Sequence, residues 1–264
     1  MADLDPRHVS DYFGRHGTVE RWWTPDSGPL SFHYDAEIQV LEDHLTVDPD
    51  WQVLDVGTGR GRFGAWFAQQ GCRVVGVDVN PEMLDEARAS AQRLGVEDRF
   101  RLEQASAEDL SGLGEAVFDV VLCMELFDHL PDLDRALAEM KRTLKPDGRL
   151  LFTYVPSESL YGCLGNAYRL LQTGLGRKRG LISRTYTQRD LRRRLARHEL
   201  VLERYFGIGL LCINAQTRLF TDHPLTRALT ALARAEARRH PYYTGARLAR
   251  HGAHVVGVAR AVES

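Results

Sequence analysis

The feature that most constrains this chain is a glycine turn between a strand-like segment and a helical one. The mostly apolar run Val53–Val56 leads into the sequence G-T-G-R-G at 57–61, and an amphipathic pattern follows it. Glycines allow positive φ values and let a ligand lie against the backbone. A second apolar run, Val74–Val77, ends at Asp78, whose carboxylate can accept hydrogen bonds from both hydroxyls of a ribose. The two segments predict a nucleoside site.

The same signature raises the alternative of a dinucleotide site. Such a site requires the spacing G-x-G-x-x-G, which places pyrophosphate at a helix N-terminus. In this chain the third glycine, Gly61, comes one residue earlier than that spacing requires. Asp55 would repel a pyrophosphate, but it can order water or amides around an amino-acid cation. The pattern therefore favours a nucleoside carrying an amine, with a dehydrogenase or a non-enzymatic nucleotide binder as alternatives.

Strand and helix patterns alternate along most of the chain. The expected strands are 51–56, 73–78, 99–104, 118–123, 148–155, 200–206 and 253–260, and the expected helices are 61–70, 81–94, 132–144 and 187–197. Alternation of this kind predicts an α/β fold with a parallel sheet and helices on both faces. A ligand should lie at the carboxyl ends of the strands, where Gly57, Asp78, Ser106 and Met124 fall.

The chain is expected to divide into three parts. Its 264 residues, 44% of them hydrophobic, suit one large domain or a core domain with an insertion. We expect an N-terminal helical lid at 1–50 and a core at 51–206 and 251–264. The segment 207–250 is too long for a hairpin and too apolar for a solvated loop, so it is interpreted as a cap over the substrate, a dimer contact or a membrane-touching element.

Charge is distributed unevenly along the chain, and this distribution bears on which partners the protein binds. Residues 1–150 contain 15 Lys and Arg against 29 Asp and Glu, a net charge of −14, whereas 151–264 contain 19 against 7, a net charge of +12. The basic cluster consists of Arg177, Lys178, Arg179, Arg184, Arg189, Arg192, Arg193, Arg194 and Arg197. It is either a solvated helix face or a surface for anionic lipid, an acidic substrate or RNA phosphates.

Four widely spaced cysteines and the lack of a signal-like or membrane-spanning segment favour a cytoplasmic protein, with peripheral membrane contact as an option. The oligomeric state is not indicated.

The loop after the fourth strand carries the candidate catalytic residues. If the segment after Met124 is helical, Glu125, Asp128 and His129 lie at i, i+3 and i+4 and share one face. Two carboxylates beside an imidazole form either a base with its orienting partners or an incomplete metal site. In the alternative interpretation, His129 caps the turn before Pro131 and Glu125 is solvated.

The first motif, V-L-D-V-G-T-G-R-G at 53–61, resembles that of the class I S-adenosylmethionine-dependent methyltransferases. The resemblance implies a Rossmann-like, mostly parallel seven-stranded sheet of order 3-2-1-4-5-7-6 whose last strand is antiparallel. It also implies S-adenosylmethionine as cofactor. The cofactor-binding residues implied by match are Asp55, Gly57, Thr58, Gly59, Gly61, Asp78, Val79, Met83, Ser106, Ala107 and Met124.

The string E-x-x-D-H at 125–129 resembles the corresponding stretch of ubiquinone-biosynthesis O-methyltransferases and of small-RNA 2′-O-methyltransferases. There the acid, acid and histidine coordinate a divalent cation, which implies Mg²⁺ on Glu125, Asp128 and His129. Those families supply a further histidine downstream, whereas residues 182–187 of this chain offer Arg184 and no histidine.

The N-terminal segment supports the quinone-pathway branch. Trp22, Trp23 and His33 resemble the WW…G…LH opening of those enzymes, and a tandem Trp pair suits a lid on an aromatic substrate. With Tyr154, these three are the expected substrate residues. Ala36 and Gln39 stand where the family has Asn and Arg, and that Arg normally meets the cofactor carboxylate.

These observations predict an O-methyltransferase that acts on a hydroxyl of a hydrophobic, aromatic small molecule such as a quinone, phenol or polyketide-like compound. The alternatives are an N- or C-methyltransferase of a small molecule, an RNA methyltransferase that uses the basic cluster at 177–197, and a non-catalytic cofactor binder. The chain contains no recognisable RNA-binding module, which disfavours nucleic acid as a partner.

Overall fold

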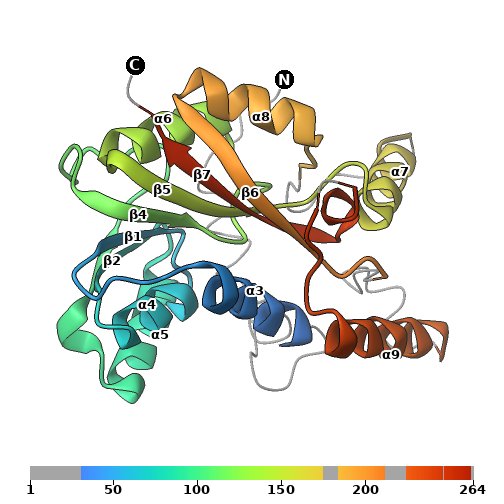
Figure 1. Cartoon of the computed structure of the whole chain (residues 1–264), viewed down its shortest axis with the longest axis horizontal. Helices are drawn as coiled ribbons and strands as arrows, with labels where there is room; N and C mark the ends of the chain where they lie inside the picture. Colours follow the sequence, from blue (N-terminus) through green and yellow to red (C-terminus); the bar gives the residue numbers. More distant parts are fainter. Residues whose placement is uncertain (1–30, 175–183, 212–223, 246, 263–264) are drawn as a thin grey trace.

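The protein is built on one seven-stranded sheet (Figure 1). The structure, a computed structural model, describes residues 31–174, 184–211, 224–245 and 247–262. The strands are β1 (Gln52–Val56), β2 (Arg73–Asp78), β3 (Phe100–Gln104), β4 (Phe118–Cys123), β5 (Leu144–Tyr154), β6 (Leu200–Ile208) and β7 (His254–Ala261). Their order is β3-β2-β1-β4-β5-β7-β6, and β7 is antiparallel to both neighbours. The order implied by the family resemblance is therefore confirmed.

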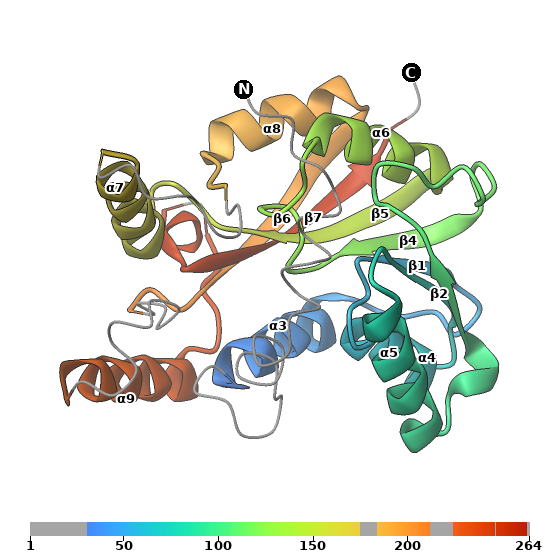
Figure 2. The ribbon, with the colours of Figure 1, turned by 180° about the vertical axis from the view of Figure 1, so that it is seen from behind.

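Helices cover both faces of the sheet, as Figures 1 and 2 show from opposite sides. The helices are α3 (Ser31–His44), α4 (Arg62–Gln69), α5 (Pro81–Leu94), α6 (Leu133–Thr143), α7 (Leu160–Gly174), α8 (Gln188–Arg197) and α9 (Pro224–Arg239). Helices α3, α4 and α5 lie on one face, and α6 and α8 lie on the other. This layering buries the apolar β1 and β4 between two hydrophobic layers.

The caps explain why the chain turns where it does at the carboxyl ends of the strands. Asn80 Oδ1 accepts a hydrogen bond from the Glu82 amide at 2.9 Å, and Pro81 occupies the first turn of α5. Asp132 caps α6 in the same way through the Arg135 amide at 3.1 Å. Both helices therefore begin close to the sheet edge at which a ligand is expected.

Two elements differ from the sequence-based expectation. None of the helices expected from the sequence falls in the segment 156–184, but this segment contains α7, whose Leu160, Leu164, Leu170 and Leu171 are exposed. Its glycines interrupt the apolar periodicity, so the helical signal of this segment is weak. Strand β5 begins at Leu144, earlier than expected, because the K-P-D-G segment continues into the strand.

Helix α9 and its flanks form the part of 207–250 that the structure describes. Glu236 of α9 accepts hydrogen bonds from the Leu210 amide at 2.8 Å, the Leu211 amide at 2.9 Å and the Tyr243 hydroxyl at 2.8 Å. Helix α9 also packs against α3. These contacts anchor the segment to the end of β6, and its role as a cap stays a prediction, as does the division into lid, core and insertion.

Several arginines of the basic cluster contact the fold itself. Arg184 donates to the Leu130 carbonyl at 3.1 Å, Arg192 donates to the Leu202 carbonyl at 3.3 Å, and Arg194 and Arg197 pair with Asp134. Residues 177–179 lie outside the described part of the chain. No helix within the described ranges combines the length and the apolarity that crossing a bilayer requires.

Candidate active site

A cavity of about 710 Å³ lies at the carboxyl ends of β1, β2 and β4. This volume is in the range of small-molecule and cofactor pockets. Most of the expected cofactor residues line it, namely Asp55, Gly57, Thr58, Gly59, Asp78, Val79, Met83, Ser106, Ala107 and Met124. Gly61 does not line it, because its position at the start of α4 places it against Phe100 and Ala87.

The glycine turn leaves room for a ligand. Gly57 has a φ of +70°, and a Cβ there would lie 2.5 Å from the Leu126 Cδ2 atom. Gly59 has a φ of +52°, and a Cβ there would meet nothing within 4 Å, so its backbone borders open space. Both positions need the left-handed conformation that glycine adopts without strain. The turn is shaped to bring backbone atoms close to a bound molecule.

Backbone amides hold the Asp78 carboxylate in place. Its Oδ2 atom accepts from the Gly59 amide at 3.0 Å, and its Oδ1 atom accepts from the Asn80 amide at 2.9 Å. A carboxylate has about four lone-pair sites, so both oxygens retain capacity for ribose hydroxyls. Burial raises the pKa of Asp78 despite these bonds. The carboxylate is thus fixed in orientation at the cavity wall.

Asp55 is almost fully buried beneath the glycine turn. Its Oδ2 atom accepts from the Thr58 hydroxyl at 2.7 Å and from the Gly64 amide at 3.0 Å. Burial raises the pKa of Asp55 to about 6. A cation bound in the cavity would favour the charged carboxylate. The role of Asp55 beside an amino-acid ammonium group stays a prediction.

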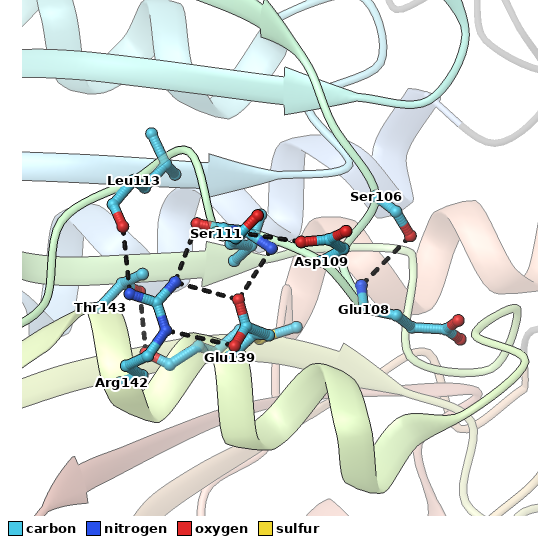
Figure 3. Close-up of polar contacts among 10 residues, drawn as sticks. Ser106, Glu108, Asp109, Ser111, Leu113, Glu139, Arg142 and Thr143 are labelled. Atoms are coloured by element: carbon cyan, nitrogen blue, oxygen red, sulfur yellow. Dashed lines mark hydrogen bonds and ion pairs between the residues drawn. The ribbon is translucent and has the colours of Figure 1, made fainter.

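The loop after β3 is tied to α6, as Figure 3 shows. Arg142 donates to the Leu110 carbonyl at 2.8 Å and to the Leu113 carbonyl at 3.1 Å, and Glu139 accepts from the Leu110 amide at 2.8 Å. At the start of this loop, Ser106 Oγ accepts from the Glu108 amide at 3.2 Å. These bonds attach the loop to α6, and Ser106 at its start lines the cavity.

The segment after Met124 forms turns, so the expected shared helical face is wrong. Glu125 has a left-handed backbone, with φ +55°, and its amide donates to Thr153 Oγ1 at 2.6 Å. Glu125 and His129 line the cavity, whereas Asp128 does not. Asp128 Oδ2 instead lies 3.4 Å from His129 Nε2. The turn separates Glu125 from Asp128 and His129, and the three do not form a group fit for Mg²⁺ within the described chain.

Glu125 joins three residues that sequence reasoning did not connect with it. The buried His/Glu group consists of His33 and Glu37 from α3, Glu125, and His254 from the start of β7. Glu125 Oε1 lies 2.7 Å from His254 Nδ1. The ring centroids of His33 and His254 are 4.4 Å apart in an edge-to-face arrangement. Four ionisable side chains thus share one buried space beside the cavity.

Burial and mutual charge set the protonation of this group. Burial lowers the pKa of His33 to about 3, and it raises the pKa of Glu37 well above its usual range, with the charge of Glu125 adding to the effect. Burial alone would raise the pKa of Glu125, but the adjacent His254 holds it well below its usual range. The same contact outweighs burial at His254 and raises its pKa.

Two of the expected substrate residues lie away from the cavity. His33 does not line the cavity, because it points from α3 into the buried His/Glu group. Tyr154 is 1% exposed and lies beside Phe152 in the core, with 6.2 Å between the ring centroids, so it does not line the cavity either. Trp22 and Trp23 lie outside the described residues.

The cavity lining includes residues that the sequence analysis did not single out, and Arg62 and Tyr34 are two of them. The Arg62 guanidinium lies 4.9 Å from the centroid of the Tyr34 ring, and both side chains line the cavity. Gln39, which stands where the resembling family has Arg, donates to Asp43 Oδ1 at 3.0 Å instead. One feature of the sequence could have indicated Arg62. It is the first residue of α4, directly after the glycine turn, where a side chain can reach a ligand bound at that turn.

Comparisons with known proteins agree with this geometry. The family model of a methyltransferase domain matches residues 54–152. The ubiquinone biosynthesis O-methyltransferase of Alkalilimnicola ehrlichii is 31% identical over 183 residues, which cover 64% of this chain and 70% of the relative. The enzyme of the same name from Hahella chejuensis is 33% identical over 177 residues, which cover 64% of this chain and 72% of the relative.

A solved structure also shares the fold. The S-adenosylmethionine-dependent methyltransferase of Thermotoga maritima, described as a possible histamine N-methyltransferase, superposes with a TM-score of 0.63 at 21% identity, over 96% of this chain and 99% of that one.

The sheet order and the glycine-turn cavity define the Rossmann-like methyltransferase class. The relatives narrow this further: the chain belongs to the class I S-adenosylmethionine-dependent methyltransferases.

Proposed function

We propose that the protein transfers a methyl group to a hydroxyl of a hydrophobic, aromatic small molecule such as a quinol or phenol. The observation that carries the proposal is the placement of His129 and Glu125 in the same cavity wall as Met124, next to the glycine turn. An imidazole and a carboxylate at that position suit an acceptor that must lose a proton. The names of the ubiquinone-pathway relatives support the choice of an oxygen acceptor.

The chain's own residues orient the cofactor in this proposal. S-adenosylmethionine supplies an electrophilic methyl group when bound. Asp78 accepts from the ribose hydroxyls, and Asp55 organises the glycine turn around the ammonium group. Arg62, whose buried Nη1 atom has no hydrogen-bond partner among the described residues, pairs with the carboxylate of the methionine part. Val79, Met83 and Ser106 border the adenine.

His129 is the proposed general base. Its side chain lines the cavity, and its Nε2 atom lies 3.4 Å from Asp128 Oδ2. A carboxylate at that distance stabilises the imidazolium that forms when His129 takes the hydroxyl proton. Bound S-adenosylmethionine would supply the methyl carbon to that oxygen, and its sulfur would be left as a neutral thioether. Holding the two reactants in alignment is the larger part of the catalysis.

The substrate class is tested by incubating the protein with radiolabelled S-adenosylmethionine and a panel of catechols, quinols, simple phenols and amines. We expect label in the extractable hydroxyl products, with hydrophobic aromatic acceptors preferred. Transfer to amines or carbon acceptors alone would contradict O-methylation while leaving the methyltransferase assignment intact. Bulk RNA serves as a further acceptor in the panel, and labelled RNA would contradict a small-molecule substrate.

Replacing His129 with alanine is expected to lower kcat by about 100-fold, in the range that a positioned base contributes. Cofactor affinity should change by less than about threefold, since His129 is assigned to the acceptor side. Single-turnover rates and calorimetric titration with the cofactor measure the two effects. The control is His240→Ala, which removes an exposed histidine at the end of α9 and should leave both unchanged. Equal activity in the His129 variant would make this residue structural.

A further inference from the structure

The buried His/Glu group has the composition and spacing of a metal site. His33 and Glu37 lie one helical turn apart on α3, so their side chains leave the same face of the helix. One ligand atom from each of the four residues lies within 4.8 Å of all the others. Ligand atoms around an ion with bonds of about 2.1 Å are about 3.4 Å apart in a tetrahedron and about 4.2 Å apart across an octahedron. Small side-chain rotations therefore suffice to close the group around one ion.

Two members of the group, His33 and Glu37, are buried with few polar partners. His33 is 5% exposed and Glu37 is 0% exposed. Neither ring nitrogen of His33 has a hydrogen-bond partner among the described residues, and the Glu37 carboxylate has none there apart from its contact with the Glu125 carboxylate. The nearest cationic atom, Arg62 Nη1, is 4.0 Å from Glu37 Oε2, which is too long for a hydrogen bond. Unsatisfied buried polar atoms are costly, and a bound cation would satisfy them together.

We propose that the buried His/Glu group binds one divalent transition-metal ion, of the class of Zn²⁺ or Mn²⁺. Two imidazoles and two carboxylates are the donors that such ions accept, whereas Mg²⁺ and Ca²⁺ prefer oxygen ligands and water. The ligand set differs from the E-x-x-D-H triad: it shares Glu125 but replaces Asp128 and His129 with residues from α3 and β7.

The position of the ion bears on how the acceptor hydroxyl loses its proton. Of the four ligands Glu125 lines the cavity and the other three do not, so an ion bound to the Glu125 carboxylate would lie just behind the cavity lining. If the proposed O-methylation holds, a hydroxyl or a pair of adjacent hydroxyls can reach this ion and lose a proton more readily. The metal site itself does not depend on that reaction.

Metal binding is tested without substrate. The protein, carrying Cys163→Ser to remove an exposed thiol, is dialysed against a chelator and titrated by calorimetry with ZnCl₂, MnCl₂ and MgCl₂. We expect one Zn²⁺ or Mn²⁺ per chain, bound at least about tenfold more tightly than Mg²⁺. At 100 times the dissociation constant, the ion should raise Tm by roughly 5 °C or more. Absence of binding, or equal binding of Mg²⁺, would overturn the proposal.

Variants distinguish the two ligand sets. Glu37→Gln and His254→Gln should each weaken metal binding by about 100-fold, since each removes one of four ligands. Asp128→Asn and His129→Gln are the matched controls and should change it by less than about threefold. If Asp128→Asn and His129→Gln lost the ion while Glu37→Gln and His254→Gln retained it, the site would be assigned to the E-x-x-D-H triad instead.

If Glu37→Gln or His254→Gln fails to fold, the metal site is tested by spectroscopy on the wild-type protein. Co²⁺ bound by two imidazoles and two carboxylates gives visible absorption bands, and a competing Zn²⁺ should abolish them stoichiometrically. A Co²⁺ spectrum of an ion with water ligands only would contradict the site. Because these readouts need neither cofactor nor acceptor, a negative result on the acceptor panel leaves them unaffected.

Discussion

Replacing Glu125 with glutamine is expected to lower kcat for methyl transfer by about 1000-fold, or about 4 kcal/mol of transition-state stabilisation. Glu125 lines the cavity, and its carboxylate accepts from His254 at 2.7 Å. Glutamine keeps the shape of the side chain but removes the charge that raises the pKa of His254. It also removes an anionic group that can bind a cation or a proton next to the acceptor. Both losses should lower the rate of methyl transfer and leave the affinity for the cofactor unchanged.

The Glu125 experiment has a defined pattern of controls. Calorimetric titration should give an unchanged affinity for the cofactor in Glu125→Gln, and the far-ultraviolet circular dichroism spectrum should match the wild type. Glu125→Asp retains the charge on a shorter side chain and should recover part of the lost rate. A glutamine variant with wild-type kcat would show that the carboxylate has no part in the reaction.

Replacing Asp78 with alanine is expected to weaken S-adenosylmethionine binding by at least about 100-fold. The carboxylate faces the cavity with its orientation fixed by the Gly59 and Asn80 amides. Hydrogen bonds from two ribose hydroxyls to a charged acceptor contribute about 1.5–3 kcal/mol each, and about 1.4 kcal/mol corresponds to a tenfold change in affinity. Alanine removes both bonds and also releases the Gly59 amide from its partner.

The control for Asp78 is a second carboxylate that lines the same cavity. Glu86 of α5 is exposed and lies 3.8 Å from the Arg60 guanidinium, at the outer part of the wall. Glu86→Ala should change cofactor affinity by less than about threefold. Thermal unfolding of both variants without cofactor separates a binding effect from a folding defect. Equal cofactor affinities in Asp78→Ala and the wild type would contradict the assignment of Asp78 as the acceptor for the ribose hydroxyls.

The parts of the site that could be predicted from the sequence are those whose signal is local. The G-T-G-R-G turn and Asp78 each follow an apolar strand, so their positions at one sheet edge follow from the parallel arrangement. Most strand boundaries follow from the same periodicity, but the start of β5 at Leu144 does not. The order of β7 and β6 came only from the family resemblance, since no local pattern distinguishes the two antiparallel pairings.

The buried His/Glu group could not be predicted in the same way. Glu125 and His254 are 129 positions apart in the chain, and no periodic pattern links them. His33 and Glu37 do have the i, i+4 spacing of a helical face, but this spacing is common on surfaces that bind nothing. The positive φ of Glu125, which breaks the expected helix, is a second reason, because it redirects the side chain away from Asp128.

The place of β7 in the sheet has a consequence for biosynthesis. It is the last strand in chain order, yet it pairs with β5 on one side and β6 on the other, and it begins with His254. While the ribosome is still translating the preceding segments, β5 and β6 lack the strand that joins them. A nascent chain can therefore form the glycine turn early, but the imidazole of His254 joins that of His33 only when β7 pairs with β5 and β6.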